Sequence, residues 1–185
     1  MKKSIIIACL CLCSSIANAQ FWVGGQISST KGKNTSIPGN TVKTRSFKFL
    51  PEVGYAFNND WEVAVRIGID YSKAKFSSDK SKARSAFIIE PYARYNVCNL
   101  GKNVSFFLDG GIGIENGDFF HKGEYYKSET MFGAGIRPGI KYRATNKMTL
   151  VATFGGLGVN IIDKNTDAGF NLNGNSLTIG CYFDL

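Results

Sequence analysis

The sequence predicts an all-β chain that folds as an eight-stranded antiparallel up-and-down transmembrane β-barrel. Three observations predict this fold class. Apolar and polar residues alternate over long segments, the connections between segments alternate between long and short, and charged residues gather on one face of the segments. The composition agrees, because glycine (21 residues) and aromatic residues (13%) are abundant while charged residues make up only 19%. At 44% hydrophobic residues, the chain does not belong to the disordered class.

The first nineteen residues have the three parts of a secretory signal peptide. Lys2 and Lys3 form a positive start, a short apolar stretch follows, and the sequence Ala-Asn-Ala then offers a cleavage site. A lipoprotein cleavage site at Cys9 is the less favoured alternative, because the apolar stretch continues past that cysteine. We therefore expect a signal peptide over residues 1–19 and an outer-membrane β-barrel domain over residues 20–185.

The strands are recognised by a period of two. In the segment 61–71 every odd-numbered residue is apolar or aromatic, while Glu62, Arg66 and Asp70 occupy the opposite face. In the segment 45–57, one face carries Phe47, Phe49, Val53, Tyr55 and Phe57, and the other carries Lys48, Glu52 and Gly54. The expected strands, in chain order, are 21–30, 45–57, 61–71, 84–97, 104–115, 128–143, 148–161 and 175–185.

The connections between these strands are of two kinds. The expected short turns are 58–60, 98–103 and 144–147, and the expected long loops are 31–44, 72–82, 116–127 and 163–173. Short turns on one side and long loops on the other are the layout of an outer-membrane barrel, whose short turns face the periplasm. An even number of strands places both ends of the barrel on the periplasmic side.

The charged residues of the strands lie on one face. Six are positive and six negative, and together they form an expected lumenal charge network: Lys48, Glu52, Glu62, Arg66, Asp70, Arg84, Glu90, Arg94, Asp109, Glu115, Arg137 and Lys141. A soluble barrel or sandwich would bury these charges and expose the apolar face to water, whereas a membrane barrel has a polar lumen and an apolar outside. Cross-strand pairs such as Glu52 with Arg66 should neutralise the network. We expect it to plug the narrow lumen; a narrow ion path is the alternative.

Aromatic residues lie near the strand ends, as the interfacial girdles of a membrane barrel require. The expected periplasmic girdle contains Tyr55, Phe57, Trp61, Tyr95, Tyr142 and Phe183, and the expected outer girdle contains Tyr71, Phe87 and Phe132.

Several motifs in order along the chain resemble the small outer-membrane β-barrel family of Bacteroidetes, with OmpA- and OmpX-type architecture. They are residues 51–55, 91–95, 106–113, 132–142 and 154–158. The C-terminal segment resembles the signal that the barrel assembly machinery recognises, through Thr178, Gly180, Phe183 and Leu185, although Leu185 replaces the usual Phe. The resemblance implies a Gram-negative outer membrane and contacts with its lipid and lipopolysaccharide; it does not imply a catalytic activity.

No catalytic or metal-binding constellation stands out. His121 is the only histidine, and residue 123 is Gly where the lipid A deacylase barrels carry the serine of a His-x-Ser pair. No set of His, Cys and Asp residues has the spacing of a metal site, so we expect neither a metal nor a cofactor. Cys98 is expected in a periplasmic turn and Cys181 on the lipid face of the last strand, too far apart to pair.

Positive charge outside the barrel concentrates in the first two expected long loops. These basic outer loops carry Lys31, Lys33, Lys43, Lys73, Lys75, Lys80 and Lys82. Such a basic rim can attract the phosphates of lipopolysaccharide or an acidic host surface; simple solvation of exposed lysines is the other interpretation.

The sequence thus predicts a monomeric, non-catalytic outer-membrane barrel with a structural or surface-interaction role in envelope integrity, adhesion or lipopolysaccharide contact. A narrow porin-like channel for ions or very small solutes is the alternative, and a lipid A-modifying enzyme is the lesser one. No nucleic-acid partner is expected.

Overall fold

The computed structural model describes residues 20–185 except 38–39, 76–80, 122–123, 163–164 and 172–176. The expected signal peptide therefore lies outside the described residues. Within the described ranges every regular element is a strand: β1 (Gln20–Ile37), β2 (Asn40–Ala56), β3 (Trp61–Lys75), β4 (Ser81–Leu100), β5 (Val104–His121), β6 (Glu124–Arg143), β7 (Met148–Thr153), β8 (Gly156–Ile162), β9 (Asn165–Asn171) and β10 (Thr178–Asp184). The described residues contain no helix long and apolar enough to cross a membrane.

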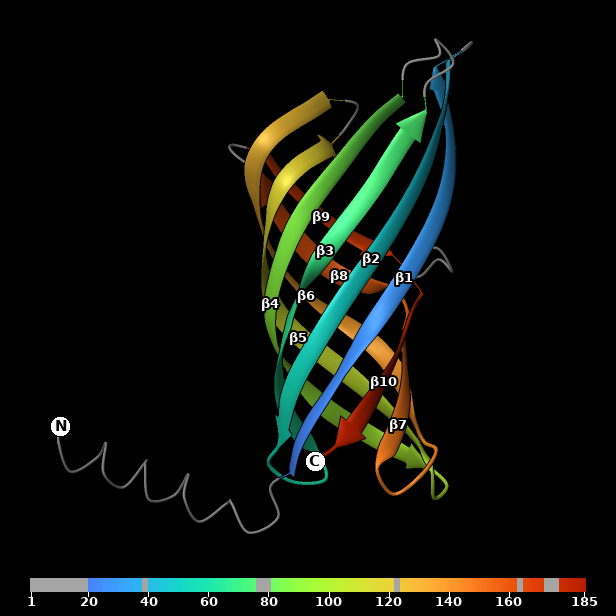
Figure 1. The fold of residues 1–185 in the computed structure, drawn as a ribbon, viewed down its shortest axis with the longest axis vertical. Helices are drawn as coiled ribbons and strands as arrows, with labels where there is room; N and C mark the ends of the chain where they lie inside the picture. Colours follow the sequence, from blue (N-terminus) through green and yellow to red (C-terminus); the bar gives the residue numbers. More distant parts are fainter. Residues whose placement is uncertain (1–19, 38–39, 76–80, 122–123, 163–164, 172–176) are drawn as a thin grey trace, which may run out of the picture.

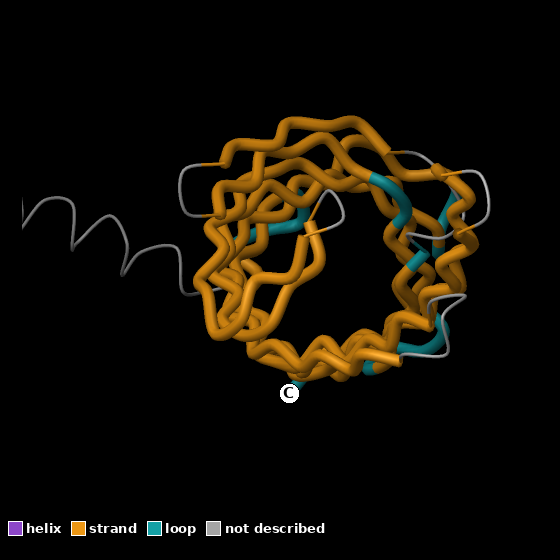
Figure 2. Tube along the Cα trace, turned by 90° about the horizontal axis from the view of Figure 1, so that it is seen from above, coloured by secondary structure: helices purple, strands orange, loops and turns teal. Residues whose placement is uncertain are grey.

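The strands close into an eight-stranded antiparallel barrel, as predicted. Neighbours in sequence pair with each other from β1 to β6, and β10 pairs with both β1 and β7 to close the ring. Figure 2 shows this ring from above. The seventh crossing is made by β7 and then β8, both paired with β6, and the eighth by β9 and then β10.

The seventh crossing is interrupted by a bulge that the sequence interpretation did not anticipate. Gly139 pairs with Thr153 on one side of it and Ile136 pairs with Leu157 on the other. Pro138 lies at this point and has no N–H to donate to the ladder, while its carbonyl accepts a hydrogen bond from the Phe154 backbone N–H at 3.1 Å. Gly155 follows with φ +66°, a backbone conformation that favours glycine.

The short turns lie where the sequence predicts them, at the end of the barrel where β1 begins and β10 ends (Figure 1). Asn58 stabilises the turn between β2 and β3, because its side-chain oxygen accepts the backbone N–H groups of Asp60 and Trp61, both at 2.8 Å. Gly101, with φ +85°, forms the turn after β4. This turn is shorter than predicted, since β4 continues to Leu100 and includes the exposed Cys98.

The predicted long loops are the main error in the sequence interpretation. Most of residues 31–44, 72–82 and 116–127 continue the strands, and β9 occupies part of 163–173. The reason is physical. Hydrophobic alternation stops where the barrel leaves the apolar membrane core, but the backbone ladder continues: Lys33 pairs with Lys43, and Lys43 with Lys75.

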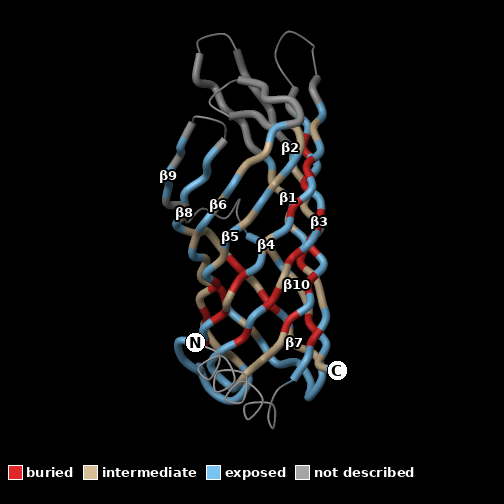
Figure 3. Tube along the Cα trace, turned by 90° about the vertical axis from the view of Figure 1, so that its left-hand side faces the viewer, coloured by how far each residue is buried: buried red, intermediate tan, exposed pale blue. Residues whose placement is uncertain are grey.

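Burial alternates along each strand in the inverted sense that a membrane barrel requires. Inward positions are buried, and outward ones expose large apolar side chains such as Phe49, Ile69 and Phe132. Four predicted residues of the periplasmic girdle and all three of the outer girdle are about half exposed: Trp61, Tyr95, Tyr142 and Phe183, and Tyr71, Phe87 and Phe132. Figure 3 shows that most buried residues gather in the half of the barrel that holds β7 and β10.

Candidate functional site: the lumen and the outer wall

Four carboxylates and four cations form one connected series in the lumen. We call it the lumenal charge chain. Its members, in order of contact, are Arg137, Glu90, Arg66, Asp109, Arg94, Glu62 and Lys141, with Glu52 as a branch on Arg66. Its charges balance, and six of the eight residues are buried or nearly so because β2 to β5 direct them inward at alternate positions.

Arg66 is the branch point of the chain. Its guanidinium donates to Glu52 at 3.0 Å, to Glu90 at 3.2 Å and to Asp109 at 2.6 Å. The pairing of Glu52 with Arg66 predicted from the sequence is confirmed, and the two residues face each other across β2 and β3. One planar guanidinium therefore joins three strands, a task suited to the fixed fork of arginine donors.

Two aromatic rings cover the faces of the buried guanidinium groups. The Arg66 Cζ atom lies 3.9 Å from the centre of the Tyr92 ring, and the Arg94 Cζ atom lies 3.9 Å from the centre of the Phe107 ring. Carboxylates satisfy the edges of these cations while rings cover their faces, an arrangement that offsets the cost of removing them from water.

Tyrosine and glutamine side chains extend the network beyond the charges. The Tyr92 hydroxyl donates to Glu52 at 2.6 Å and the Tyr182 hydroxyl donates to Glu52 at 3.0 Å. Tyr182 also accepts from Gln26 at 2.7 Å and from Arg94 at 3.2 Å. These residues were missing from the sequence-based set, although Tyr92 shares an alternating face with Glu90 and Arg94 and could have been included.

The other four predicted lumenal charges lie farther toward the outer end. Lys48 forms a salt bridge with Asp70 at 3.0 Å, and Arg84 donates to the buried Ser72 hydroxyl. Glu115 lies among these residues at an inward, half-buried position. The twelve predicted charges thus form two groups, a dense chain near the short turns and a looser set above it.

An open cavity of about 660 Å³ occupies the outer half of the lumen. Lys48, Glu115, Arg137 and several hydroxyls line it, and one wall consists largely of inward-facing glycines of β5, β6 and β8. The lumenal charge chain lies on the side of the short turns, so the described lumen is wide at one end and filled at the other.

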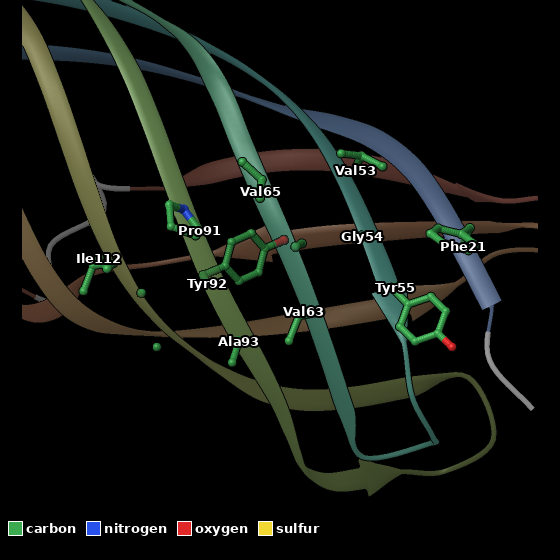
Figure 4. A pocket seen from close by; sticks show the side chains of 13 residues that line it. Phe21, Val53, Gly54, Tyr55, Val63, Val65, Pro91, Tyr92, Ala93 and Ile112 are labelled. Carbon is green, nitrogen blue, oxygen red and sulfur yellow. The ribbon is translucent and has the colours of Figure 1, made fainter. Parts of the chain in front are cut away.

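A second hollow, of about 720 Å³, lies on the outward face of β2 to β5 and is almost entirely apolar. Figure 4 shows Val53, Val63 and Ala93 around it, with Phe21 and Tyr55 at one end. Small side chains at neighbouring positions create this hollow, including Gly110, which pairs with Ala93. It faces away from the lumen and makes no contribution to the charge chain.

The remaining predicted site residues lie elsewhere. Lys31 and Lys73 belong to strands rather than loops and are exposed, Lys33, Lys43, Lys75 and Lys82 also lie within strands, and Lys80 lies outside the described residues. His121 is the last residue of β5 and pairs with Glu124. Within the described part of the chain, no group of three or more His, Cys, Asp or Glu residues could hold a metal ion.

Comparison with known proteins gives a consistent match to membrane barrels. A family model described as outer membrane protein beta-barrel domain matches residues 5–183. A Haemophilus influenzae protein, named only as uncharacterized, is 25% identical over 182 residues, covering 91% of this chain and 97% of that protein.

Solved structures resemble the chain in fold. Neisserial surface protein A (NspA) has a TM-score of 0.55 at 22% identity, covering 91% of this chain and 99% of NspA. The N-terminal β-barrel domain of Pseudomonas aeruginosa OprF has a TM-score of 0.46 at 13% identity, covering 90% of this chain and 96% of that domain.

Proposed function

The chain belongs to the outer membrane protein beta-barrel domain family, and we propose that it is a non-catalytic barrel that acts through its outer surface while its lumen stays closed. The family and its structural neighbours imply the outer membrane of a Gram-negative bacterium. The role we propose is structural or adhesive: envelope integrity, contact with lipopolysaccharide, or attachment to host surfaces.

The observation that supports this proposal is the lumenal charge chain. Arg94 and Asp109 are completely buried and Arg66 is 1% exposed, which supports a lumen that is closed to water at their level. Separating such pairs would leave buried charges unpaired, which costs about 3–5 kcal/mol for each broken pair. A barrel sealed in this way carries its activity on its surface.

We further propose that residues 1–19 are removed as a signal peptide and that the barrel inserts as a monomer. The barrel assembly machinery would recognise Thr178, Gly180, Phe183 and Leu185, of which the first three lie in β10. A source in Bacteroidetes remains a prediction from the resemblance.

One observation favours a narrow channel as the second candidate. The outer half of the lumen already holds a cavity of about 660 Å³, so only the charge chain would have to rearrange for ions to pass. A lipid A-modifying enzyme has less support, because glycine occupies the position of the serine in the His-x-Ser pair at His121.

Trimming the outer hairpins tests the surface role. Replacing residues 32–43 by a two-residue turn should abolish capture of host extracellular matrix by the refolded barrel. A heat-modifiable band on gels should be retained. The matched control shortens the β5–β6 hairpin by replacing residues 119–126. Equal capture by the 32–43 variant and the intact barrel would refute a surface role for the basic hairpin.

A further inference from the structure

Three cations lie side by side on the outer wall of the barrel. Lys31 of β1 pairs with Arg45 of β2, and Arg45 pairs with Lys73 of β3, so the three residues form one row across three strands. All three are exposed and lie on the outward face, the same face as Phe47 and Tyr71. We call Lys31, Arg45 and Lys73 the cationic row. Arg45 lies in the expected strand 45–57 rather than in an expected long loop, so it is not among the predicted basic loop residues.

The cationic row has no internal counter-charge. Among the described residues, none of its three members forms a salt bridge, whereas Lys48 on the inner face is paired with Asp70. Like charges directly opposite each other on neighbouring strands destabilise a sheet. An anion from outside the chain would relieve this repulsion, and the row leaves its charged groups free to meet one.

The position of the row along the barrel points to the headgroup level of the membrane. The row immediately before it contains Phe47 paired with Tyr71, both about half exposed, as interfacial aromatics are. The two rows lie two residues apart along the strand, which is a rise of about 7 Å. Because the strands of a barrel are tilted, the separation along the membrane normal is smaller still. The cations therefore lie just outside the aromatic belt rather than at the tips of the hairpins.

The positive charge continues outward in register. Lys33 pairs with Lys43, and Lys43 with Lys75, two residues beyond the cationic row on the same three strands. No aspartate or glutamate occupies these paired positions on β1, β2 and β3. Lysines thus occupy a second paired register beyond the cationic row, and the cationic row is the register nearer to the aromatic residues.

We propose that the cationic row binds the phosphate groups of lipopolysaccharide in the outer leaflet. The row faces sideways into the plane of the membrane, where lipid headgroups lie, rather than outward toward soluble molecules. Arginine presents a planar fork that matches two phosphate oxygens, and flanking lysines add point charges. This inference rests on the proposed surface role and identifies its partner by chemistry: a lipid-anchored phosphate.

The test uses the complete mature barrel refolded in phospholipid nanodiscs that contain a small fraction of fluorescent lipopolysaccharide. Enrichment of the label around the barrel is measured for the wild type and for K31Q/R45Q/K73Q. The matched control, K102Q/R143Q/K147Q, also removes three exposed cations, but at the short-turn end. Parallel samples contain lipopolysaccharide stripped of its phosphates, and others contain the soluble polyanion heparin as a competitor.

Each basic residue near a charged membrane surface contributes about fivefold to lipid binding, so the row variant should bind about 100-fold more weakly. The control variant should bind intact lipopolysaccharide as strongly as the wild type does. The wild type should bind dephosphorylated lipopolysaccharide only weakly, as the row variant binds intact lipopolysaccharide. Unchanged binding by the row variant would overturn the inference. So would strong heparin binding through the row without enrichment of lipopolysaccharide, which would assign the row to a soluble anion. A conducting lumen would instead refute the sealed barrel and leave this result intact.

Discussion

Arg94 and Asp109 form a two-pronged hydrogen bond at the centre of the barrel. The Arg94 Nε atom donates to Asp109 Oδ1 at 2.7 Å, and Nη2 donates to Oδ2 at 3.0 Å, with neither residue exposed. Asp109 also accepts from Arg66 at 2.6 Å. One carboxylate therefore holds two guanidinium groups, which makes it the residue on which the proposed closure of the lumen depends most.

Asp109→Ala should destabilise the barrel by about 3–5 kcal/mol, because it leaves two buried cations without their shared partner. Urea-dependent unfolding in lipid vesicles, followed by tryptophan fluorescence, measures the change. Glu129→Ala removes an exposed carboxylate and should change the free energy of unfolding by no more than about 0.5 kcal/mol. Equal effects of the two substitutions would show that Asp109 has no special role.

Tyr182→Phe should cost about 1–3 kcal/mol, because one buried hydroxyl connects Gln26, Arg94 and Glu52. The same unfolding assay applies. Tyr142 is 45% exposed, so Tyr142→Phe is the matched control and should be nearly neutral. A larger loss in the free energy of unfolding for Tyr142→Phe than for Tyr182→Phe would contradict the network interpretation.

Gly155→Ala should cost about 1–2 kcal/mol, because its φ of +66° is unfavourable for residues with a Cβ atom. Gly110→Ala offers a glycine control in the same barrel, since a Cβ atom there would meet nothing within 4 Å. The difference between their midpoints of urea unfolding reports the strain at the bulge. A Gly110 variant as unstable as the Gly155 variant would contradict this explanation.

The two tryptophans should respond oppositely to brominated lipid. Trp61 is 47% exposed on the outward face, whereas Trp22 is 3% exposed and stacks on Tyr182 at a ring distance of 4.2 Å. In vesicles of brominated phospholipid, the Trp22→Phe variant should lose most of its fluorescence and the Trp61→Phe variant should keep most of it. The reverse pattern would mean that the two faces of the barrel are exchanged.

The sequence was sufficient to predict the barrel because inward and outward residues differ in polarity within the membrane. Glu62 and Arg66 alternate with Val63, Val65 and Ile67, and this pattern fixes both the strand and its orientation. Outside the membrane both faces of a strand are polar. Residues 31–37 therefore resemble a loop in sequence while forming part of β1.

The details of the site depend on cross-strand register, which periodicity alone does not provide. The cationic row depends on the register that places Arg45 opposite both Lys31 and Lys73, and the sequence alone does not give this register. The break between β7 and β8 depends equally on how Pro138 aligns with Phe154. By contrast, the pairing of Glu52 with Arg66 could be inferred, because only a short turn separates their strands.

Single-channel recording in planar lipid bilayers tests the sealed lumen most directly. The wild-type barrel, shown to be folded by its heat-modifiable band, should produce no discrete conductance steps, while a general porin in the same bilayers should produce them. Reproducible steps from the folded wild-type barrel would contradict the account, because ions would then pass the level of Arg66, Arg94 and Asp109.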